Sequence, residues 1–577
     1  MMNLESRHFI NGVEIRPKNA DDIGLKMDWS GNTEEAELTT DSIVLENLAK
    51  KLVIEHIETL GIFEGLPYTF MVGNFSLDYY IDLTDNPLIS GVGDSAVEVT
   101  IKRRRAIDWF KQQANGLSFE SLNRTNPINV LDVPYLIIKD NQAEMLIMLI
   151  ISIYTLQKAL AESINEVVEA IAEVTAAATP NVGVPPSINL GAVINAVVLA
   201  AARIIYTLAL IVMLLDMIGQ IIEIIFPPLR KFKGATVLEL MQKGCTKLGM
   251  TFQSSIIEGM PQLTIVGVPL KKNKQSILNQ LNILNSSYFN KGYPTARDFA
   301  VSTLGKLMDA LQEMFNAKFR IIGNNIVFER RDYWVLNSGL TITNTLNLQN
   351  VRENQWGYNT GDAWKRYYMR YQYDISDWHT MDNLDDTDCE YSTEPVSVVN
   401  ADLVSIKGLV EISIPFAYGT RKESLTFVEE FAATFCRLAD TLINFLGGDS
   451  SFESSITGRI GVMMIGQEFF STTKLIYQVN GRQPSNYRGI IGANSLYQEY
   501  HSINEVKANF KRIYTERIPF STDNFLMLLN NNYVLDQNGN SLEILTFEWI
   551  NESKTAEITY SELSNEGNNT ETILIDA

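Results

Sequence analysis

A long apolar stretch, residues 145–226, constrains the fold of this chain more than any other feature. Aliphatic side chains fill most of it, and no charged residue lies between Glu173 and Arg203. A segment of this kind cannot stay exposed in water, because apolar surface costs roughly 25 cal/mol per Å². The fold must therefore cover the stretch with protein or with lipid.

Two helices are predicted here, one over 145–178 and one that ends at Phe226. The first half is rich in Ala, Leu and Glu, which favour helices. Prolines break the helix within 179–187, and Ser187 or Asn189 can cap the second helix. The result is a helical hairpin with arms roughly 50–60 Å long, since each residue adds about 1.5 Å. Such arms exceed the roughly 30 Å of hydrocarbon in a bilayer.

The two predicted helices differ in charge. On the second, Asp216 and Glu223 share one face and the rest is apolar nearly all round, so it must be buried in protein or lipid. On the first, glutamates recur at spacings of four, three and four, which places them on one stripe. This acidic stripe suits water or a polar lumen, and it consists of Glu162, Glu166, Glu169 and Glu173.

Composition excludes several classes of protein. The chain has 577 residues, 46% of them hydrophobic, which is enough for several cores. A net charge of −21 argues against a general nucleic-acid binder, which needs a basic face. Three scattered cysteines are too few for a disulfide framework or a zinc site. The N-terminus shows no secretory pattern, so we expect synthesis in the cytoplasm.

On either side of the apolar stretch the sequence predicts an α+β fold of strand-rich domains. Turn residues such as Asn11-Gly12 indicate β-hairpins. Periodic apolar residues predict helices over 47–60, stopped by Gly61, and over 296–315. We predict four segments: an N-terminal β-rich domain (1–135), the hydrophobic helical hairpin (136–232), an α+β helix-hairpin module (233–335) and a C-terminal α+β domain (336–577).

The sequence offers few candidates for chemistry. The carboxylates of 374–390 leave open a calcium site or an exposed acidic loop, because their spacing fits no EF-hand. His379 and Cys389 within this region could imitate a nucleophilic pair, but nothing in the sequence places them together. The rings of 367–373 are interpreted as a half-buried strand rather than a carbohydrate platform. The basic run 102–105 is interpreted as a salt-bridging strand end. We expect no catalytic site, no cofactor and no metal site.

The ends of the chain resemble structural tail proteins of tailed bacteriophages, especially those of Bacteroides-type hosts. The residues that carry this resemblance are His8-Phe-Ile-Asn-Gly-Val-Glu-Ile15, Tyr80-Ile-Asp-Leu83, Ile107-Asp-Trp-Phe110 and the stretches 469–481, 504–529 and 542–560. The segment 296–330 is similar to modules of baseplate or tail-tip hub proteins. The resemblance implies a structural role in the virion, a ring-forming hub and no enzymatic activity. In physical character, the apolar insert is similar to the tail knobs of short-tailed phages.

From these observations we predict an oligomeric tail-tip hub in the virion tail, synthesised in the host cytoplasm. Its expected partners are other copies of itself, other tail proteins, the host membrane on infection and passing DNA without specific binding. The acidic stripe would face the lumen and repel phosphates. The residues predicted to plug the lumen or enter the membrane are Met145, Leu146, Ile150, Ile151, Ile204, Ile205, Leu208, Leu210, Ile211, Leu214, Leu215, Ile218, Ile221, Ile222 and Phe226.

Two alternatives remain open at this point. A pore-forming toxin or effector would stay a soluble monomer until its apolar hairpin inserts. An integral membrane protein with two spans is disfavoured, because the acidic stripe is costly in lipid.

Overall fold

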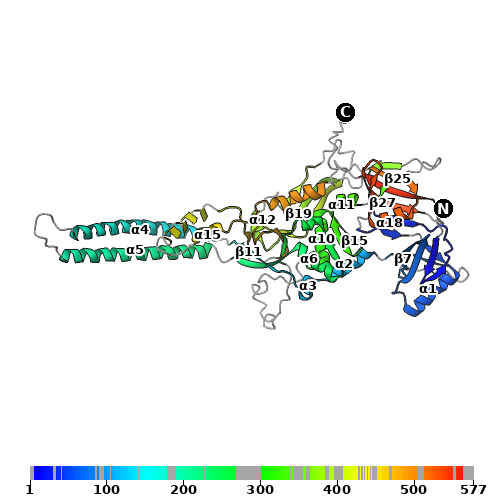
Figure 1. Cartoon of the computed structure of the whole chain (residues 1–577), viewed down its shortest axis with the longest axis horizontal. Helices are drawn as coiled ribbons and strands as arrows, with labels where there is room; N and C mark the ends of the chain where they lie inside the picture. The colour runs from blue at the N-terminus through cyan, green and yellow to red at the C-terminus, as the bar shows by residue number, and fades with distance from the viewer. Residues whose placement is uncertain are drawn as a thin grey trace, which may run out of the picture.

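The fold is that of a computed structural model. The structure describes residues 6–29, 34–39, 42–84, 88–89, 96–103, 105–138, 142–178, 190–225, 229–267, 301–337, 339–342, 355–358, 364–383, 389–395, 407–425, 451–466, 471–502, 512–549, 554–562 and part of 429–444. A broad body holds the sheets and most of the helices, and two long helices project from one end of it (Figure 1).

A six-stranded mixed sheet lies at the end of the body that carries the long helices. Its strands run in the order β22-β24-β14-β12-β11-β23. Their bounds are Ala417–Tyr418 (β22), Lys474–Tyr477 (β24), Leu263–Val266 (β14), Arg230–Thr236 (β12), Leu131–Ile137 (β11) and Met463–Ile465 (β23). β11 and β12 are antiparallel neighbours in the interior of this sheet. The two long helices lie between them in sequence.

The main core lies beside this sheet and is built largely by amphipathic helices. α10 (Leu304–Phe315) buries eight of its residues, in agreement with the apolar periodicity of its sequence. It packs with α2 (Ala106–Gly116), α6 (Val237–Lys247) and the strands β15 (Lys318–Ile322) and β16 (Asn325–Glu329). The remaining elements here are α3 (Phe119–Thr125), β13 (Thr251–Gln253), α7 (Ser255–Glu258), α11 (Arg331–Leu336), α12 (Trp378–Asn383), α16 (Arg488–Ile491), α17 (Ala493–Leu496) and the π-helical turn Tyr497–His501.

A second region combines strands from the N-terminal and the C-terminal parts of the sequence. An eight-stranded sheet takes the path β17-β26-β27-β28-β25-β18, and β3 and β4 extend it from the side of β27. β3 comes from the N-terminal segment, so residues predicted to lie in separate domains share this sheet. The elements are β3 (Leu25–Asp28), β4 (Glu37–Thr39), β17 (Thr341–Ile342), β18 (Gln355–Tyr358), β25 (Arg512–Pro519), α18 (Thr522–Asn530), β26 (Tyr533–Asp536), β27 (Ser541–Trp549) and β28 (Thr555–Glu562).

The N-terminal segment forms two further sheets. In the first, Asn11 and Gly12 adopt φ values of 48° and 79° and close the predicted hairpin. The chain changes sheets at Thr100, between Val99, which pairs with Ile43, and Ile101, which pairs with Ile81. The elements are β1 (Ser6–Ile10), β2 (Val13–Ile15), β5 (Ile43–Leu45), α1 (Asn47–Leu60), β6 (Leu66–Val72), β7 (Phe75–Ile81), β8 (Leu88–Ile89), β9 (Val97–Val99) and β10 (Ile101–Lys102).

One more sheet holds the aromatic strand singled out by the sequence. Its order is β20-β19-β21, with bounds Glu390–Ser392, Trp364–Tyr371 and Lys407–Ile414. Tyr367 and Tyr371 of β19 point into the core and are almost fully buried, whereas Tyr368 between them is only partly covered. This alternation confirms a half-buried strand.

The α+β class is confirmed, since helices and several antiparallel strand pairs make up the described residues. The two predicted long helices are present as α4 (Gln142–Ala178) and α5 (Leu190–Ile225), joined in sequence by 179–189, which lie outside the described residues. The four-segment division stays a prediction.

Candidate functional site

The candidate site is the pair of long helices, and its base is fixed by the six-stranded sheet. β11 leads into α4 and α5 leads into β12, with Tyr135 opposite Arg230 across the antiparallel ladder. The rings of Tyr135 and Phe232 meet edge to face, with centroids 5.2 Å apart. β23 pairs with the outer edge of β11, and β14 pairs with the outer edge of β12. The strands that lead into the two helices are therefore held in the sheet on both sides.

The spacing of buried side chains shows how α4 and α5 pack together. Covered positions recur alternately after three and four residues on both helices, which is the period of a coiled coil. We call this set the seam. On α4 it comprises Ile153, Leu156, Leu160, Ser163, Val167, Ala170 and Val174, and on α5 it comprises Val193, Ala196, Ala200, Arg203, Thr207, Leu210, Leu214 and Met217.

Two polar contacts fix the register of the seam. The hydroxyl oxygens of Ser163 and Thr207 lie 2.5 Å apart in a buried hydrogen bond. The Arg203 guanidinium donates to the backbone carbonyl of Glu166 at 3.0 Å. Both contacts require the helices to run antiparallel, because the residue numbers fall on one helix as they rise on the other. A shift by one turn would leave the buried hydroxyls without each other.

Among the described residues, those that cover the helix pair from outside lie at its base. Ala433, Cys436 and Ile456 pack with the seam residues Ile153, Leu160, Leu210 and Leu214 in one small apolar cluster. Ile456 belongs to α15 (Phe452–Thr457), which Figure 1 shows beside the base of the pair.

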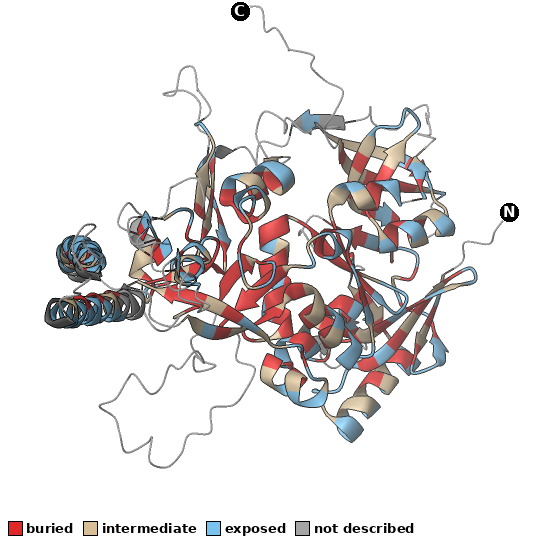
Figure 2. Ribbon diagram, turned by 60° about the vertical axis from the view of Figure 1, so that its left-hand side comes forward, coloured by how far each residue is buried: buried red, intermediate tan, exposed pale blue. Residues whose placement is uncertain are grey.

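Beyond the seam the apolar side chains are exposed, as the pale blue of the projecting helices in Figure 2 shows. Ile205 is 67% exposed, Val212 64% and Tyr154 65%. Further exposed apolar residues are Met148, Ile151, Ile164, Val168, Ile171, Ile194, Val197, Val198, Leu199, Ile204, Tyr206, Leu208 and Met213. The described residues therefore leave a continuous apolar surface along both helices, of the kind that marks an interaction site.

The predicted plug residues fall into three groups. Ile151, Ile204, Ile205 and Leu208 are exposed and available to a partner. Leu210 and Leu214 are buried in the seam and Ile211 is half-buried, so these three are not on the open surface of the pair. The side chains of Met145, Leu146, Ile150, Leu215, Ile218, Ile221, Ile222 and Phe226 lie outside the described residues.

The acidic stripe is exposed along its whole length on one flank of α4. Glu166 and Glu173 border the seam, and Glu162 and Glu169 lie one row further from it. The opposite flank of α4 carries Ile164 and Ile171 at the equivalent positions. α4 thus has a charged side and an apolar side, whereas α5 is apolar around most of its circumference.

Among the described residues, one segment is long and apolar enough to cross a membrane. It is Val193–Leu214 of α5, with a mean hydropathy of 2.4 and 22% of its residues buried. Length and composition alone support this statement, and they are weak evidence for a span. The glutamates of α4 would carry a considerable cost in the same position.

The acidic region 374–390 contains a buried charge cluster where its residues are described. Asp377 accepts hydrogen bonds from Thr380, from the amide of Gly466 and from the Lys474 ammonium. Burial raises the pKa of Asp377, but the attraction of Lys474 and these hydrogen bonds outweigh it and hold the pKa below its ordinary value. Asp374 is tied to Ser471, so neither carboxylate stands in an open loop. The aspartates of 385–388 lie outside the described residues.

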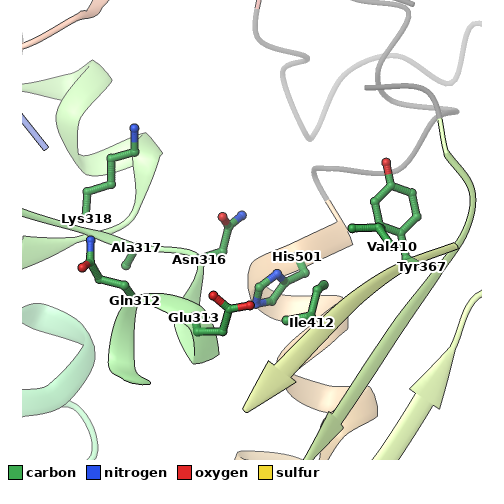
Figure 3. Close-up of a pocket in the computed structure, with 9 residues that line it drawn as sticks. All are labelled: Gln312, Glu313, Asn316, Ala317, Lys318, Tyr367, Val410, Ile412 and His501. Carbon is green, nitrogen blue, oxygen red and sulfur yellow. The ribbon is translucent and has the colours of Figure 1, made fainter. Parts of the chain in front are cut away.

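A cavity of about 240 Å³ lies between α10, β15, β19 and β21 (Figure 3). In Figure 3, Glu313 and Lys318 lie on one side of the cavity, Tyr367 and Ile412 lie on the other, and His501 lies between Glu313 and Ile412. Burial lowers the pKa of Lys318 to about 8 and that of His501 to about 4. This cavity was not predicted, because no spacing in the sequence signals that α10 packs near β19 and β21.

Lys102 and Arg105, at the two ends of the basic run 102–105, are paired with acidic side chains. Lys102 donates to Asp82 at 2.9 Å, and Arg105 forms an ion pair with Asp108 at 2.6 Å. These contacts agree with the interpretation of the run as a salt-bridging strand end. Within the described ranges, no cluster of three or more potential metal-ligating side chains occurs.

Comparisons with known proteins add little to the geometry described above. No family model matches the chain, and no curated protein matches it. Among solved structures the chain is similar to a prophage tail protein, gp18, from Listeria monocytogenes EGD-e. The two share 8% sequence identity over 96% of this chain and 90% of that one, with a TM-score of 0.27. A similarity this low does not assign a fold or a function.

Proposed function

We propose that the chain is a structural protein of a bacteriophage tail tip, a hub or knob, whose copies assemble through their helix pairs. The observation that carries the proposal is the exposed apolar surface of α4 and α5 on a body whose own cores are buried. At roughly 25 cal/mol per Å², covering this surface is a strong driving force for association. The resemblance of the chain ends to tail proteins supplies the setting, and the proposal assigns no enzymatic activity.

In this proposal the gathered helix pairs close the tip of the tail as a plug within a ring of bodies. The host membrane is the second surface able to cover the pairs, once a trigger separates them. α5 supports this step, because Val193–Leu214 is long and apolar enough to span. The net charge of −21 keeps passing DNA from adhering. Other tail proteins are the remaining proposed partners.

The sharpest test removes the helix pair and keeps the body. Since Tyr135 pairs with Arg230, a short Gly-containing turn can replace 138–229 and close β11 and β12 as an ordinary hairpin. We expect the full chain to sediment as a defined oligomer and the shortened chain as a monomer with unchanged strand content by circular dichroism. A monomeric full chain would contradict the proposed assembly.

Membrane entry has its own test. Vesicles loaded with a fluorescent dye report leakage when the full chain is added, and the shortened chain is the matched control. Leakage with the full chain alone supports entry. Without leakage under any change of pH or salt, the helix pair has only the plug role.

A pore-forming toxin is the alternative function, favoured by the same apolar helix. It predicts that the full chain is a stable monomer before it meets lipid and then leaks vesicles. The sedimentation measurement separates the two functions, because a tail hub requires the oligomer first.

A further inference from the structure

The seam assigns every residue of the helix pair to a side of its helix, and these sides differ in chemistry. On α5 the side directly opposite the seam carries Val198, Ile205 and Val212. The two flanks of α5 are also apolar, with Val197 and Ile204 on one and Leu199, Tyr206 and Met213 on the other. Asn195, Ala202, Ala209 and Asp216 form one further row, in which the side chains are small or polar.

On α4 only one flank is apolar. It carries Ile164 and Ile171 next to the seam, with Tyr154 and Val168 one row further out. In an antiparallel pair the corresponding flanks of the two helices lie on the same side, so this flank adjoins Val197 and Ile204 of α5. The side of α4 opposite the seam is mainly polar or small, with Lys158, Asn165 and Ala172, and the remaining flank is the acidic stripe.

An apolar seam extended by apolar flanks is the pattern of helices that pack in bundles rather than as isolated pairs. One partner pair would cover only part of α5, because its exposed apolar residues occupy the back and both flanks. At least two further pairs are needed to surround α5. α4 needs cover on one flank only and can keep its charged side in water.

Resting on the proposed assembly, we propose that three or more copies of this chain join their helix pairs into one bundle with α5 inside and α4 outside. The apolar flank of each α4 packs against the α5 of a neighbouring copy. The acidic stripe then faces the surrounding water, which reverses the lumen-facing placement expected from the sequence.

Lipid is a poorer occupant than a second copy for the intact pair. Helices that lie on membrane surfaces carry Lys and Arg on their polar face, which attract anionic headgroups. The polar flank of α4 carries four glutamates instead, which such a surface repels. The continuity of the exposed flanks with the seam also favours more of the same helices as neighbours.

Two cysteine variants of the full chain test the arrangement. Ile205→Cys lies on the back of α5 and Asn165→Cys on the back of α4, and both positions are exposed on a single chain. The native Cys245, Cys389 and Cys436 are buried, which keeps the background low. We expect Ile205→Cys to form disulfide-linked dimers under mild oxidation. It should react at least about tenfold more slowly with a bulky maleimide than Asn165→Cys, since labelling requires local opening.

A charge pair of variants covers the case in which disulfide geometry is unfavourable. Ile205→Glu should dissociate the oligomer, and Asn165→Glu should leave it intact. Rapid labelling of Ile205→Cys with cross-linking of Asn165→Cys, in chains that still sediment as oligomers, would overturn the inference and leave the proposed assembly standing. A wild-type monomer would overturn both. Protection of Ile205→Cys only in the presence of vesicles would identify lipid as the cover and also overturn the bundle.

Discussion

The body and the helix pair differ in how they place side chains that are unfavourable in their surroundings, namely buried charges in the body and exposed apolar groups in the helix pair. In the body, charged groups are buried and paired: Lys474 and Asp377 are both 0% exposed and hydrogen-bonded to each other. In the helix pair, apolar groups are exposed and have no partner within the described chain beyond the base. The buried charges Lys474 and Asp377 therefore find their partners within the body, whereas the exposed apolar side chains of the helix pair need a covering surface from outside the described chain. This contrast is the reason why the proposed function is assigned to the helix pair rather than to the cavity or the charge cluster.

The largest effect on stability is expected from breaking the buried charge pair. Lys474→Ala leaves the Asp377 carboxylate buried without its cation, and we expect a loss of about 3–5 kcal/mol in the free energy of unfolding. Chemical denaturation followed by tryptophan fluorescence measures it. Lys102→Ala is the matched control, because its pair with Asp82 is largely exposed and should contribute about 0–1 kcal/mol. Similar losses for both variants would mean that burying the Lys474–Asp377 pair makes it no more important for stability than a pair at the surface of the body.

The next effect concerns the interior of the seam. Leu210→Ala removes a side chain that is 6% exposed and should destabilise the helix pair by about 2–4 kcal/mol. Leu208→Ala is the control, since that side chain is 48% exposed on a single chain. Hydrogen exchange of α5 amides at low concentration is the measurement. Equal exchange in the two variants would mean that the seam does not hold the pair.

Acidification should weaken the body and spare the helix pair. Burial lowers the pKa of His8 and of His501 to about 4, so both are neutral in the folded state. Each contributes stability that is complete above the unfolded pKa of about 6.5 and is lost as the pH falls toward 4, by about 2–3 kcal/mol per histidine. No histidine lies in 142–225. Unfolding at pH 7 and pH 4.5 tests the slope, which His501→Gln should reduce; an unchanged slope contradicts the assignment to His501.

The smallest effect is expected at the first turn of the chain. Gly12 has φ +79° with no atom near the position of a β carbon, so Gly12→Ala strains the backbone without a clash. We expect a loss of about 1 kcal/mol, confined to the N-terminal sheet. Asn11, also in the left-handed region, tolerates it better. A loss as large as that of Lys474→Ala would mean that this turn governs the whole body.

Local patterns in the sequence predicted local structure well. Gly61 marks the end of α1 as expected, and the predicted helix 145–178 corresponds to α4 apart from its first turn. The helix-hairpin module predicted within 233–335 contains the hairpin of β15 and β16, because each of these strands needs only its own alternation and a turn between them. Residues 296–300, where the preceding helix was expected to begin, lie outside the described residues.

Pairings between distant residues were not predictable in this way. β11 and β12 went unrecognised, since Pro134 and Gly234 argue against strands and the partner of each lies beyond the long helices. Lys474 lies 97 residues from Asp377, and no spacing rule joins them. The seam itself follows from a period of three and four, but identical aliphatic residues surround it on α5. Only the packing shows which of them are already covered.

The position of the helix pair between two paired strands also affects how the chain can fold. Bringing β11 and β12 together across residues 138–229 as a flexible loop would carry an entropic cost that grows with the logarithm of loop length. Antiparallel helices that form first bring the chain back to within roughly 10 Å of where it left β11, because packed helix axes lie about 8–10 Å apart. The helix pair can therefore be transferred, as an insert, into another pair of antiparallel strands. If the helix pair is grafted into the turn of an unrelated β-hairpin, we expect it to make an otherwise monomeric host protein oligomerise.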